Sequence, residues 1–228
     1  FSSFMHRAKI HTLYQSINTS EYSLRSHLDK KELTILVVGH MTKAKGYTDI
    51  LDIIPDVAET YPNVLFQFAG EKRSGERGVH FCQYSGEKIK YQDPFEAEAR
   101  LLKTKFRRNY IHLGLIDGED KLRSFKAADV FLSASYSEGF SRALLEAMSV
   151  GVPLIYTPVG AHREVLSEEN GICFLPGDRT EMKEAILTML ASQTRDNLGT
   201  FNSLYAKSKF SSEIIAQNLV EIILRTIR

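Results

Sequence analysis

The stretch DVFLSASYSEGFSRALLEAMSVGVPLIY, residues 129–156, decides the fold. It opens with a short apolar run at 129–132 and closes with another at 153–156, and residues 141–150 between them have a helical pattern. Runs that are apolar throughout, rather than alternating with polar residues, are typical of parallel strands covered on both faces. The stretch therefore predicts a strand, a crossing helix and a second parallel strand.

The same alternation continues from about residue 31 onward. The helix at 180–192 has the clearest pattern, because its apolar residues recur at three- and four-residue spacing. Pro55 is expected to kink or shorten the first helix. The pattern predicts a Rossmann-like, doubly wound parallel α/β sheet of about six strands with helices on both faces. Further strands are expected at 33–38, 64–68, 110–113 and 172–174, and further helices at 46–60, 94–107, 118–127 and 180–192.

The two ends of the chain differ from the predicted sheet. Residues 1–30 are polar and are interpreted as a linker, or the end of a preceding domain. Residues 31–208 form the predicted Rossmann-like domain, and residues 209–228 form an amphipathic C-terminal helix. The polar, glycine-containing residues 71–93 are expected to form an irregular surface loop.

Composition excludes some classes of function. The 228 residues carry 29 Lys and Arg against 28 Asp and Glu, a formal charge of +1, which gives no support for nucleic-acid binding. The short basic clusters Lys72–Arg73 and Arg107–Arg108 are interpreted as solvated surface, and a peripheral membrane contact is left open. Cys82 and Cys173 match no metal-ligand spacing, and Cys173 is expected to be buried. We expect a reducing, cytoplasmic environment and no membrane span.

In an open parallel sheet, ligands bind beyond the carboxyl ends of the strands. The segment after the first predicted strand is GHMTKAKG, residues 39–46. Lys45 stands where the next helix begins, and free amides and the helix dipole favour an anion there. By itself this segment is no more specific than an ordinary solvated turn.

The segment after the fourth predicted strand is the most informative. Glu138 and Gly139 lie on the loop, and Glu146 lies inside the following helix. The neighbours of Glu146 are apolar, so this carboxylate needs a partner or a ligand. Two carboxylates flanking free helix-opening amides are suited to an extended polyol that carries phosphates. The alternative is that Glu146 binds no ligand and merely caps its helix or lies on the solvated surface of that helix.

The segment after the fifth predicted strand, residues 157–164, contains Gly160 and leads into a short helix facing the same crevice. His162 in this segment is interpreted as a surface or capping residue rather than as a catalytic base.

These segments, in this order, resemble glycosyltransferase family 4, whose members have the two-domain GT-B architecture. Residues 10–18 look like the entry to its C-terminal domain, and residues 39–46 look like its G-R-x(4)-K-G segment. Glu138 and Glu146 match its E-x7-E signature, with the customary Gly-Phe after the first Glu. Residues 110–114, 157–164, 170–171 and 176–178 also fall in family order.

The resemblance implies a role for each matching residue. Glu146 would bind the ribose hydroxyls, Glu138 would bind hydroxyls of the transferred sugar, and Lys45 would neutralise the diphosphate. The amides of Gly139, Phe140 and Ser141 would lie near that sugar and the diphosphate, Gly160 would lie in the same crevice, and the backbone at Leu115 and Ile116 would face the nucleobase.

The resemblance also implies the kind of reaction. It would be a retaining hexosyl transfer in polysaccharide biosynthesis, from a UDP- or GDP-sugar to a saccharide or lipid-linked acceptor. No cofactor and no bound metal would be needed.

Two departures from the family pattern affect these expectations. His40 stands where the family usually has Arg, so Lys43 would substitute for it or diphosphate affinity would be reduced. The family's N-terminal domain, which holds the acceptor, is absent from this sequence. The C-terminal helix would cross back to that domain, so the chain is expected to be a fragment or a subunit of a split enzyme, inactive alone.

Two other classes remain open. A sugar-nucleotide epimerase shares the architecture but would need an acid/base cluster that the sequence does not show. A non-catalytic regulatory domain with the same fold is the second alternative, which His40 keeps open. A dinucleotide oxidoreductase is disfavoured because no G-x-G-x-x-G follows the first strand.

Overall fold

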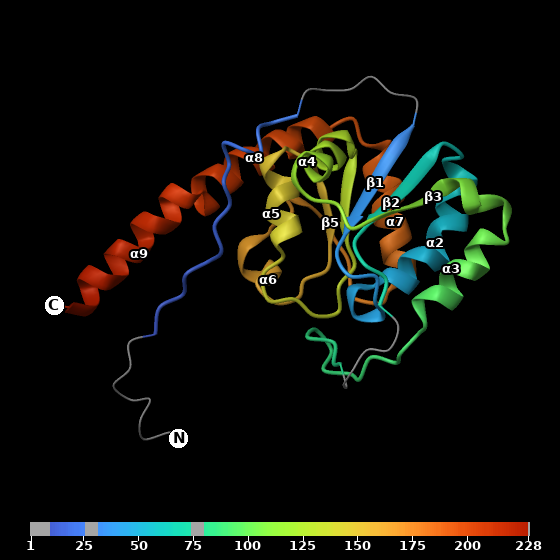
Figure 1. Cartoon of the computed structure of the whole chain (residues 1–228), viewed down its shortest axis with the longest axis horizontal. Coiled ribbons are helices and arrows are strands. Elements are labelled where there is room, and N and C mark those ends of the chain that lie inside the picture. Colours follow the sequence, from blue (N-terminus) through green and yellow to red (C-terminus); the bar gives the residue numbers. More distant parts are fainter. Residues whose placement is uncertain (1–9, 26–31, 74–79, 228) are drawn as a thin grey trace.

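The computed structural model describes residues 10–25, 32–73 and 80–227. Within these residues, six parallel strands form one sheet in the order β3-β2-β1-β4-β5-β6 (Figure 1). The chain builds outward from β1 to β3, then returns to the other side of β1 and continues to β6. The strands are β1 Leu33–Val38, β2 Val64–Ala69, β3 Tyr110–Gly114, β4 Val130–Ser133, β5 Leu154–Tyr156 and β6 Gly171–Cys173.

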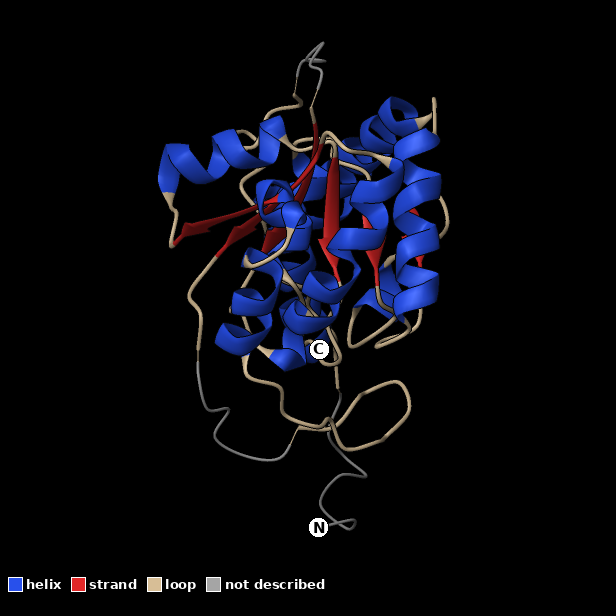
Figure 2. Cartoon of the chain, turned by 90° about the vertical axis from the view of Figure 1, so that its right-hand side faces the viewer, coloured by secondary structure: helices blue, strands red, loops and turns tan. Residues whose placement is uncertain are grey.

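Helices cover both faces of this sheet (Figure 2). One apolar cluster packs β1 and β2 against α2 and α7, and a second packs β4 and β5 against α5 and α8. The predicted doubly wound parallel sheet is therefore confirmed. The helices are α2 Tyr47–Thr60, α3 Pro94–Leu102, α4 Gly118–Ala127, α5 Arg142–Ser149, α6 His162–Val165, α7 Arg179–Ala191, α8 Arg195–Phe210 and α9 Ser212–Ile227, with short 3-10 turns η1 Lys43–Lys45 and η2 Lys105–Asn109.

Helix α2 continues through Pro55 to Thr60, so the proline does not shorten it. A proline inside a helix removes one backbone hydrogen bond and costs about 3 kcal/mol. Ile50, Ile54 and Val57 on the same helix are fully buried against the sheet. Because each buried aliphatic side chain contributes about 1.5–3 kcal/mol, their packing offsets the cost of Pro55.

Helix α8 is missing from the sequence-based expectations, which assign no element between the helix at 180–192 and the C-terminal helix. Its buried positions are Gly199, Asn202, Ala206 and Phe210. Three of these four residues are small or polar, so the usual apolar signal of a buried helix face is weak. Asn202 donates to the carbonyl oxygens of Val152 and Asn170, both at 3.0 Å, and this polar contact anchors the helix.

The expectation that Cys173 is buried is wrong. Cys173 is exposed because β6 is an edge strand, which among the described residues pairs with β5 on one side and with no strand on the other. Partial desolvation still raises the pKa of the Cys173 thiol. The apolar run around it reflects its neighbours, since Phe174 is buried.

The two ends of the described chain meet beside α8. The amide of Ile17 donates to the carbonyl of Phe210 at 2.8 Å, and Ile17 also bridges to Ser211. Helix α9 then extends away from the sheet (Figure 1). Its apolar side chains are exposed at Leu219, Val220, Ile223 and Leu224. Of the helices in the described part of the chain, none is long and apolar enough to cross a membrane.

Candidate functional site

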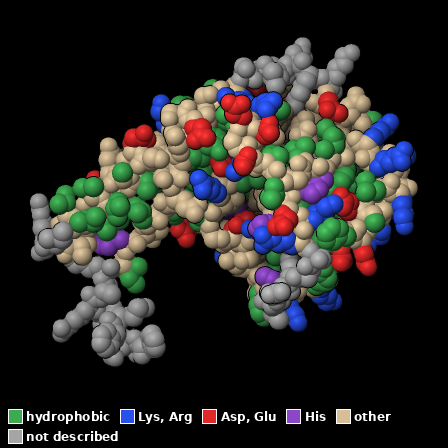
Figure 3. Space-filling model, in the orientation of Figure 1, with side chains coloured by type: hydrophobic (Ala, Val, Ile, Leu, Met, Phe, Trp, Pro, Cys, Tyr) green, Lys and Arg blue, Asp and Glu red, His purple; other side chains and the backbone are tan. Residues whose placement is uncertain are grey.

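A cavity of about 370 Å³ opens at the carboxyl ends of the strands, at the point where the chain direction switches between β1 and β4. Open α/β sheets bind ligands at such a switch point. Basic and acidic side chains lie close together on this face of the molecule (Figure 3). The polar or charged side chains in its lining are His40, Lys45, Lys121, Glu138, Ser141 and Arg142, and the predicted base-facing residues Leu115 and Ile116 also line it.

The loops after β1 and β4 are in direct backbone contact. The amide of Tyr136 donates to the carbonyl of Ala44 at 2.9 Å. Gly46 has φ +72°, and a Cβ at this position would overlap the carbonyl of Ala134. Only glycine adopts this conformation without strain and permits this approach. The contact places Lys45 on one loop directly opposite Glu138 on the other.

Glu138 lies in a network of polar groups. Its Oε1 accepts a bond from Lys45 Nζ at 2.6 Å and from Ser135 Oγ at 2.8 Å. Its amide donates to Gln83 Oε1 at 3.0 Å. Behind it, the amide of Ala161 donates to the carbonyl of Gly139 at 3.0 Å. Gly160 does not line the cavity, but a Cβ there would overlap the Glu138 carbonyl, so its bare backbone supports the turn.

Glu146 lies on α5, and only 3% of its surface is exposed. Lys121 Nζ is 2.7 Å from each carboxylate oxygen, and the Tyr22 hydroxyl donates to Oε1 at 3.0 Å. Burial, together with the neighbouring Glu146 charge, raises the pKa of Tyr22. Glu146 does not itself line the cavity, but Lys121 does. The carboxylate therefore has internal partners and is not simply solvating a helix surface.

The start of α5 presents unpaired donors to the cavity. The Ser141 hydroxyl accepts from the amide of Leu144, and no described residue accepts a hydrogen bond from the amides at 139–143. Arg142, the first residue of the helix, lines the cavity and is exposed, and it forms no ion pair with the described residues. Free amides beside a guanidinium form an environment that favours an anion.

Two residues lie in surroundings that differ from those expected from the sequence. Lys43 is outside the cavity lining, because its ammonium is buried and lies 2.6 Å from both oxygens of Asp49. His162 is fully buried rather than at the surface. Its Nδ1 is 3.1 Å from the carbonyl of Thr157, Nε2 has no partner among the described residues, and burial lowers the pKa of the ring.

The sequence-based expectations did not include Lys121, Arg142, Tyr22 or Asp49. The first two carry a signal that could have been found, since both stand in the first turn of a helix that follows a strand. Asp49 also stands in the first turn of such a helix, but its pairing with Lys43, like that of Tyr22 with Glu146, is formed only in the folded chain. Within the described segments, no group of three or more His, Cys, Asp or Glu residues is placed to hold a metal ion.

The sheet order and the cavity at its switch point define a Rossmann-like domain of the GT-B type. The structure superposes on HepE of Anabaena, solved in complex with UDP-glucose, with a TM-score of 0.74 and 18% identity, covering 93% of this chain and 57% of that one. It also superposes on the C-terminal domain of a glycosyl transferase group 1 family protein from Francisella tularensis, with a TM-score of 0.70 and 20% identity over 86% of this chain and 99% of that domain.

The chain belongs to the family Glycosyl transferases group 1, whose pattern matches residues 19–202. It is 25% identical to spore coat protein SA of Bacillus subtilis over 95% of this chain and 59% of that protein. It is 28% identical to alpha-galactosylglucosyldiacylglycerol synthase of Streptococcus pneumoniae over 96% of this chain and 51% of that protein. The chain thus spans little more than half of each of these two relatives.

Proposed function

We propose that this chain is the donor-binding domain of a retaining glycosyltransferase that takes a sugar from a UDP- or GDP-sugar. The observation that carries the proposal is that each of two carboxylates is held by a lysine that lines the cavity. Glu138 lies 2.6 Å from Lys45 and Glu146 lies 2.7 Å from Lys121. A nucleotide sugar offers hydroxyl donors at the sugar and at the ribose, with anionic phosphates between them.

Each part of such a ligand has a matching group in the site. A sugar hydroxyl donates to Glu138, and the ribose lies at the Lys121–Glu146 pair. The diphosphate lies between them, at the free amides of residues 139–143. When the bond from the anomeric carbon to the phosphate oxygen breaks, negative charge develops on the leaving diphosphate. Lys45 and the amides stabilise that charge without rearrangement. The acceptor oxygen forms the new bond to the anomeric carbon, and its proton passes to the departing phosphate oxygen.

Arg142 is the main positive charge available to the diphosphate. Lys45 and Lys121 are each neutralised by a glutamate in the free protein. The remaining charged or titratable side chains of the lining are His40 and Arg142. Arginine is always protonated and binds phosphate oxygens through two parallel donors, whereas a histidine is protonated only in part near neutral pH. Arg142 thus supplies the phosphate-binding guanidinium in place of the arginine expected at residue 40.

The acceptor would bind to another part of the enzyme. A saccharide or lipid-linked acceptor would bind to a further domain, the reaction would take place in the cytoplasm, and the donor would need no cofactor because its sugar is already activated by the diphosphate. The name of the relative from Streptococcus pneumoniae, alpha-galactosylglucosyldiacylglycerol synthase, supports a lipid-linked acceptor. A peripheral contact with the membrane is part of the same proposal. The chain alone is expected to bind the donor weakly and to transfer nothing.

Isothermal titration calorimetry tests the proposal. We expect heat of binding with UDP or GDP, tighter binding with the matching sugar nucleotide, and loss of that extra affinity in Glu138→Gln. The variant Glu146→Gln, which keeps the side-chain shape, should weaken binding of the nucleotide itself. A folded chain that binds none of UDP, GDP, UDP-glucose or GDP-mannose would exclude the proposed function.

A further inference from the structure

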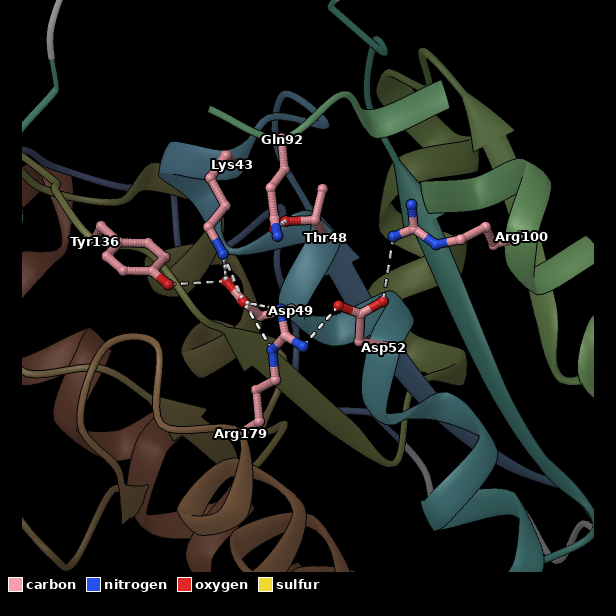
Figure 4. A network of polar contacts seen from close by, with 8 residues as sticks. All are labelled: Lys43, Thr48, Asp49, Asp52, Gln92, Arg100, Tyr136 and Arg179. Atoms are coloured by element: carbon pink, nitrogen blue, oxygen red, sulfur yellow. Dashed lines mark hydrogen bonds and ion pairs between the residues drawn. The ribbon is translucent and has the colours of Figure 1, made fainter. Parts of the chain in front are cut away.

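Asp49 is a buried carboxylate at the centre of a network of ion pairs and hydrogen bonds (Figure 4). It is in the first turn of α2, and only 3% of its surface is exposed. Lys43 donates to both of its oxygens at 2.6 Å, Tyr136 donates at 3.0 Å, and Arg179 at 3.0 Å. A buried carboxylate is stable only when its hydrogen-bonding capacity is filled in this way.

Two of these partners belong to the loops that form the candidate site. Lys43 precedes Lys45 by two residues on the loop after β1, and Tyr136 precedes Glu138 by two residues on the loop after β4. Both loops therefore have one side chain directed to Asp49 and another directed to the cavity. On the side of the cavity, side chains of the two loops are joined by the Lys45–Glu138 pair. Away from the cavity, the two loops are joined through Asp49.

Ligand binding affects these two side-chain connections differently. A donor that uses Glu138 and Lys45 must replace the bond between them, so the connection on the side of the cavity is lost when the site fills. The connection at Asp49 is buried and does not involve a residue that lines the cavity. It can hold the loops at the same separation in the free and the bound protein.

We propose that Asp49 is a positioning residue that sets the distance between Lys45 and Glu138 in the donor site. This inference rests on the proposed function for its effect on ligand binding, but its structural part is independent of the ligand. Asp49 acts through Lys43 and Tyr136 and touches no substrate.

Asp52 provides a matched control on the same helix. It forms ion pairs with Arg179 at 2.8 Å and with Arg100 at 3.7 Å, and it forms no hydrogen bond or ion pair with either loop among the described residues. Asp52→Asn therefore removes a carboxylate from the same network and leaves Lys43 and Tyr136 bound. A loss of binding in Asp49→Asn that Asp52→Asn does not share reports the position of the loops and not the general stability of α2.

Titration calorimetry with UDP-glucose and GDP-mannose, using whichever binds, measures the effect on the site. We expect Asp49→Asn to weaken binding by about tenfold to a hundredfold, since small displacements of binding groups have effects of this size. Tyr136→Phe, which loses only one hydroxyl contact, should show a smaller loss in the same direction. In a Glu138→Gln background, Asp49→Asn should add little to the loss, because residues that act through one another are not additive. Equal losses in Asp49→Asn and Asp52→Asn, or fully additive losses with Glu138→Gln, would overturn the inference.

Amide hydrogen exchange tests the same inference without a ligand. The amide of Tyr136 is bonded to the carbonyl of Ala44 and reports the contact between the loops, and the amide of Gly46 is bonded to the carbonyl of Lys43 and reports the turn that carries Lys43. We expect both to exchange at least about tenfold faster in Asp49→Asn and at an unchanged rate in Asp52→Asn. Unchanged exchange in both variants would overturn the inference even if the wild-type chain binds nucleotide sugars. Faster exchange in a chain that binds none would exclude the proposed function alone.

Discussion

Lys45 Nζ lies 2.6 Å from Glu138 Oε1, so the two groups expected to contact the phosphate and the sugar of a ligand neutralise each other in the free protein. Lys121 and Glu146 form a second pair of the same kind, with Glu146 inside α5. The site therefore has little net charge from these four residues before the ligand arrives. It follows that residues outside the two pairs decide how strongly an anion is attracted.

Replacing Arg142 with alanine tests that consequence. We expect Arg142→Ala to weaken binding of UDP or GDP by about tenfold or more, since a hydrogen bond to a charged group contributes about 1.5–3 kcal/mol. Binding of the corresponding nucleoside, which has no phosphate, should be unchanged, and both ligands are compared by calorimetry. Arg123→Ala is the control, because Arg123 is exposed on α4 and pairs with Asp120 outside the cavity lining. An equal loss for nucleoside and diphosphate would contradict the assignment of Arg142 to the phosphates.

The Lys121–Glu146 pair should contribute to stability as well as to binding. Lys121→Met leaves the Glu146 carboxylate buried without its cation, and we expect a loss of about 1–3 kcal/mol in the free energy of unfolding, less than for a wholly buried pair because Lys121 is partly exposed. Adding Glu146→Gln removes the stranded charge and should restore part of this loss. Urea unfolding of the two single variants and the double variant gives the coupling. Additive losses would show that the pair does not act as a unit.

Gly160 is expected to tolerate no side chain. Its φ is +53°, and a Cβ would overlap the Glu138 carbonyl. Gly118 is a matched control, because its φ is +48° and nothing lies within 4 Å of an added Cβ. Both alanine variants carry the cost of a left-handed backbone, about 1–2 kcal/mol, but only Gly160→Ala should also weaken binding of the sugar nucleotide. Matching affinities in the two variants, measured by calorimetry, would show that the Glu138 turn does not depend on this contact.

The burial of His162 predicts how stability depends on pH. Burial holds the pKa of His162 below its ordinary value of 6.5, so below about pH 6.5 the unfolded chain binds a proton that the folded chain does not. Stability is therefore lost as the pH falls through this window, by up to about 1.4 kcal/mol per pH unit.

Urea unfolding at pH 7.5 and 5.5 measures this dependence for the wild-type chain and His162→Gln. The variant should be less stable at pH 7.5 but should lose less on acidification. A variant at residue 162 with the full wild-type dependence would refute the role of this histidine.

Much of the fold follows from the sequence because parallel strands buried on both faces appear as short apolar runs. Each of the six predicted strands corresponds to one in the structure, with shifts of one residue at most at either end. Helix α8 could not be predicted in this way, since Gly199, Asn202 and Ala206 form its buried face and bring no apolar periodicity. The exposure of Cys173 depends on β6 lying at the sheet edge, which is a property of strand order and not of the local sequence.

The candidate site also has a part that the sequence predicts and a part that it does not. The spacing of Glu138 and Glu146 and the glycine after Glu138 can be read along the chain. Their partners Lys45, Lys121 and Tyr22 come from 25 to 124 residues away in sequence, and no local pattern brings them together. Lys43 looks like a second phosphate ligand in the sequence, because nothing in the local pattern shows that Asp49, six residues further on in the first turn of α2, is buried and binds it.

The separation of the cavity from the two apolar clusters has a consequence for divergence within the family. The polar groups that line the cavity come from loops and the first turns of helices, whereas the clusters lie along strands and helix faces. Substitution of lining residues such as Leu115 or Ile116 can therefore change which ligand the cavity accepts, with the interior left intact. Gly46 and Gly160 are the positions that must stay unchanged meanwhile, because they bring the backbones of neighbouring loops together.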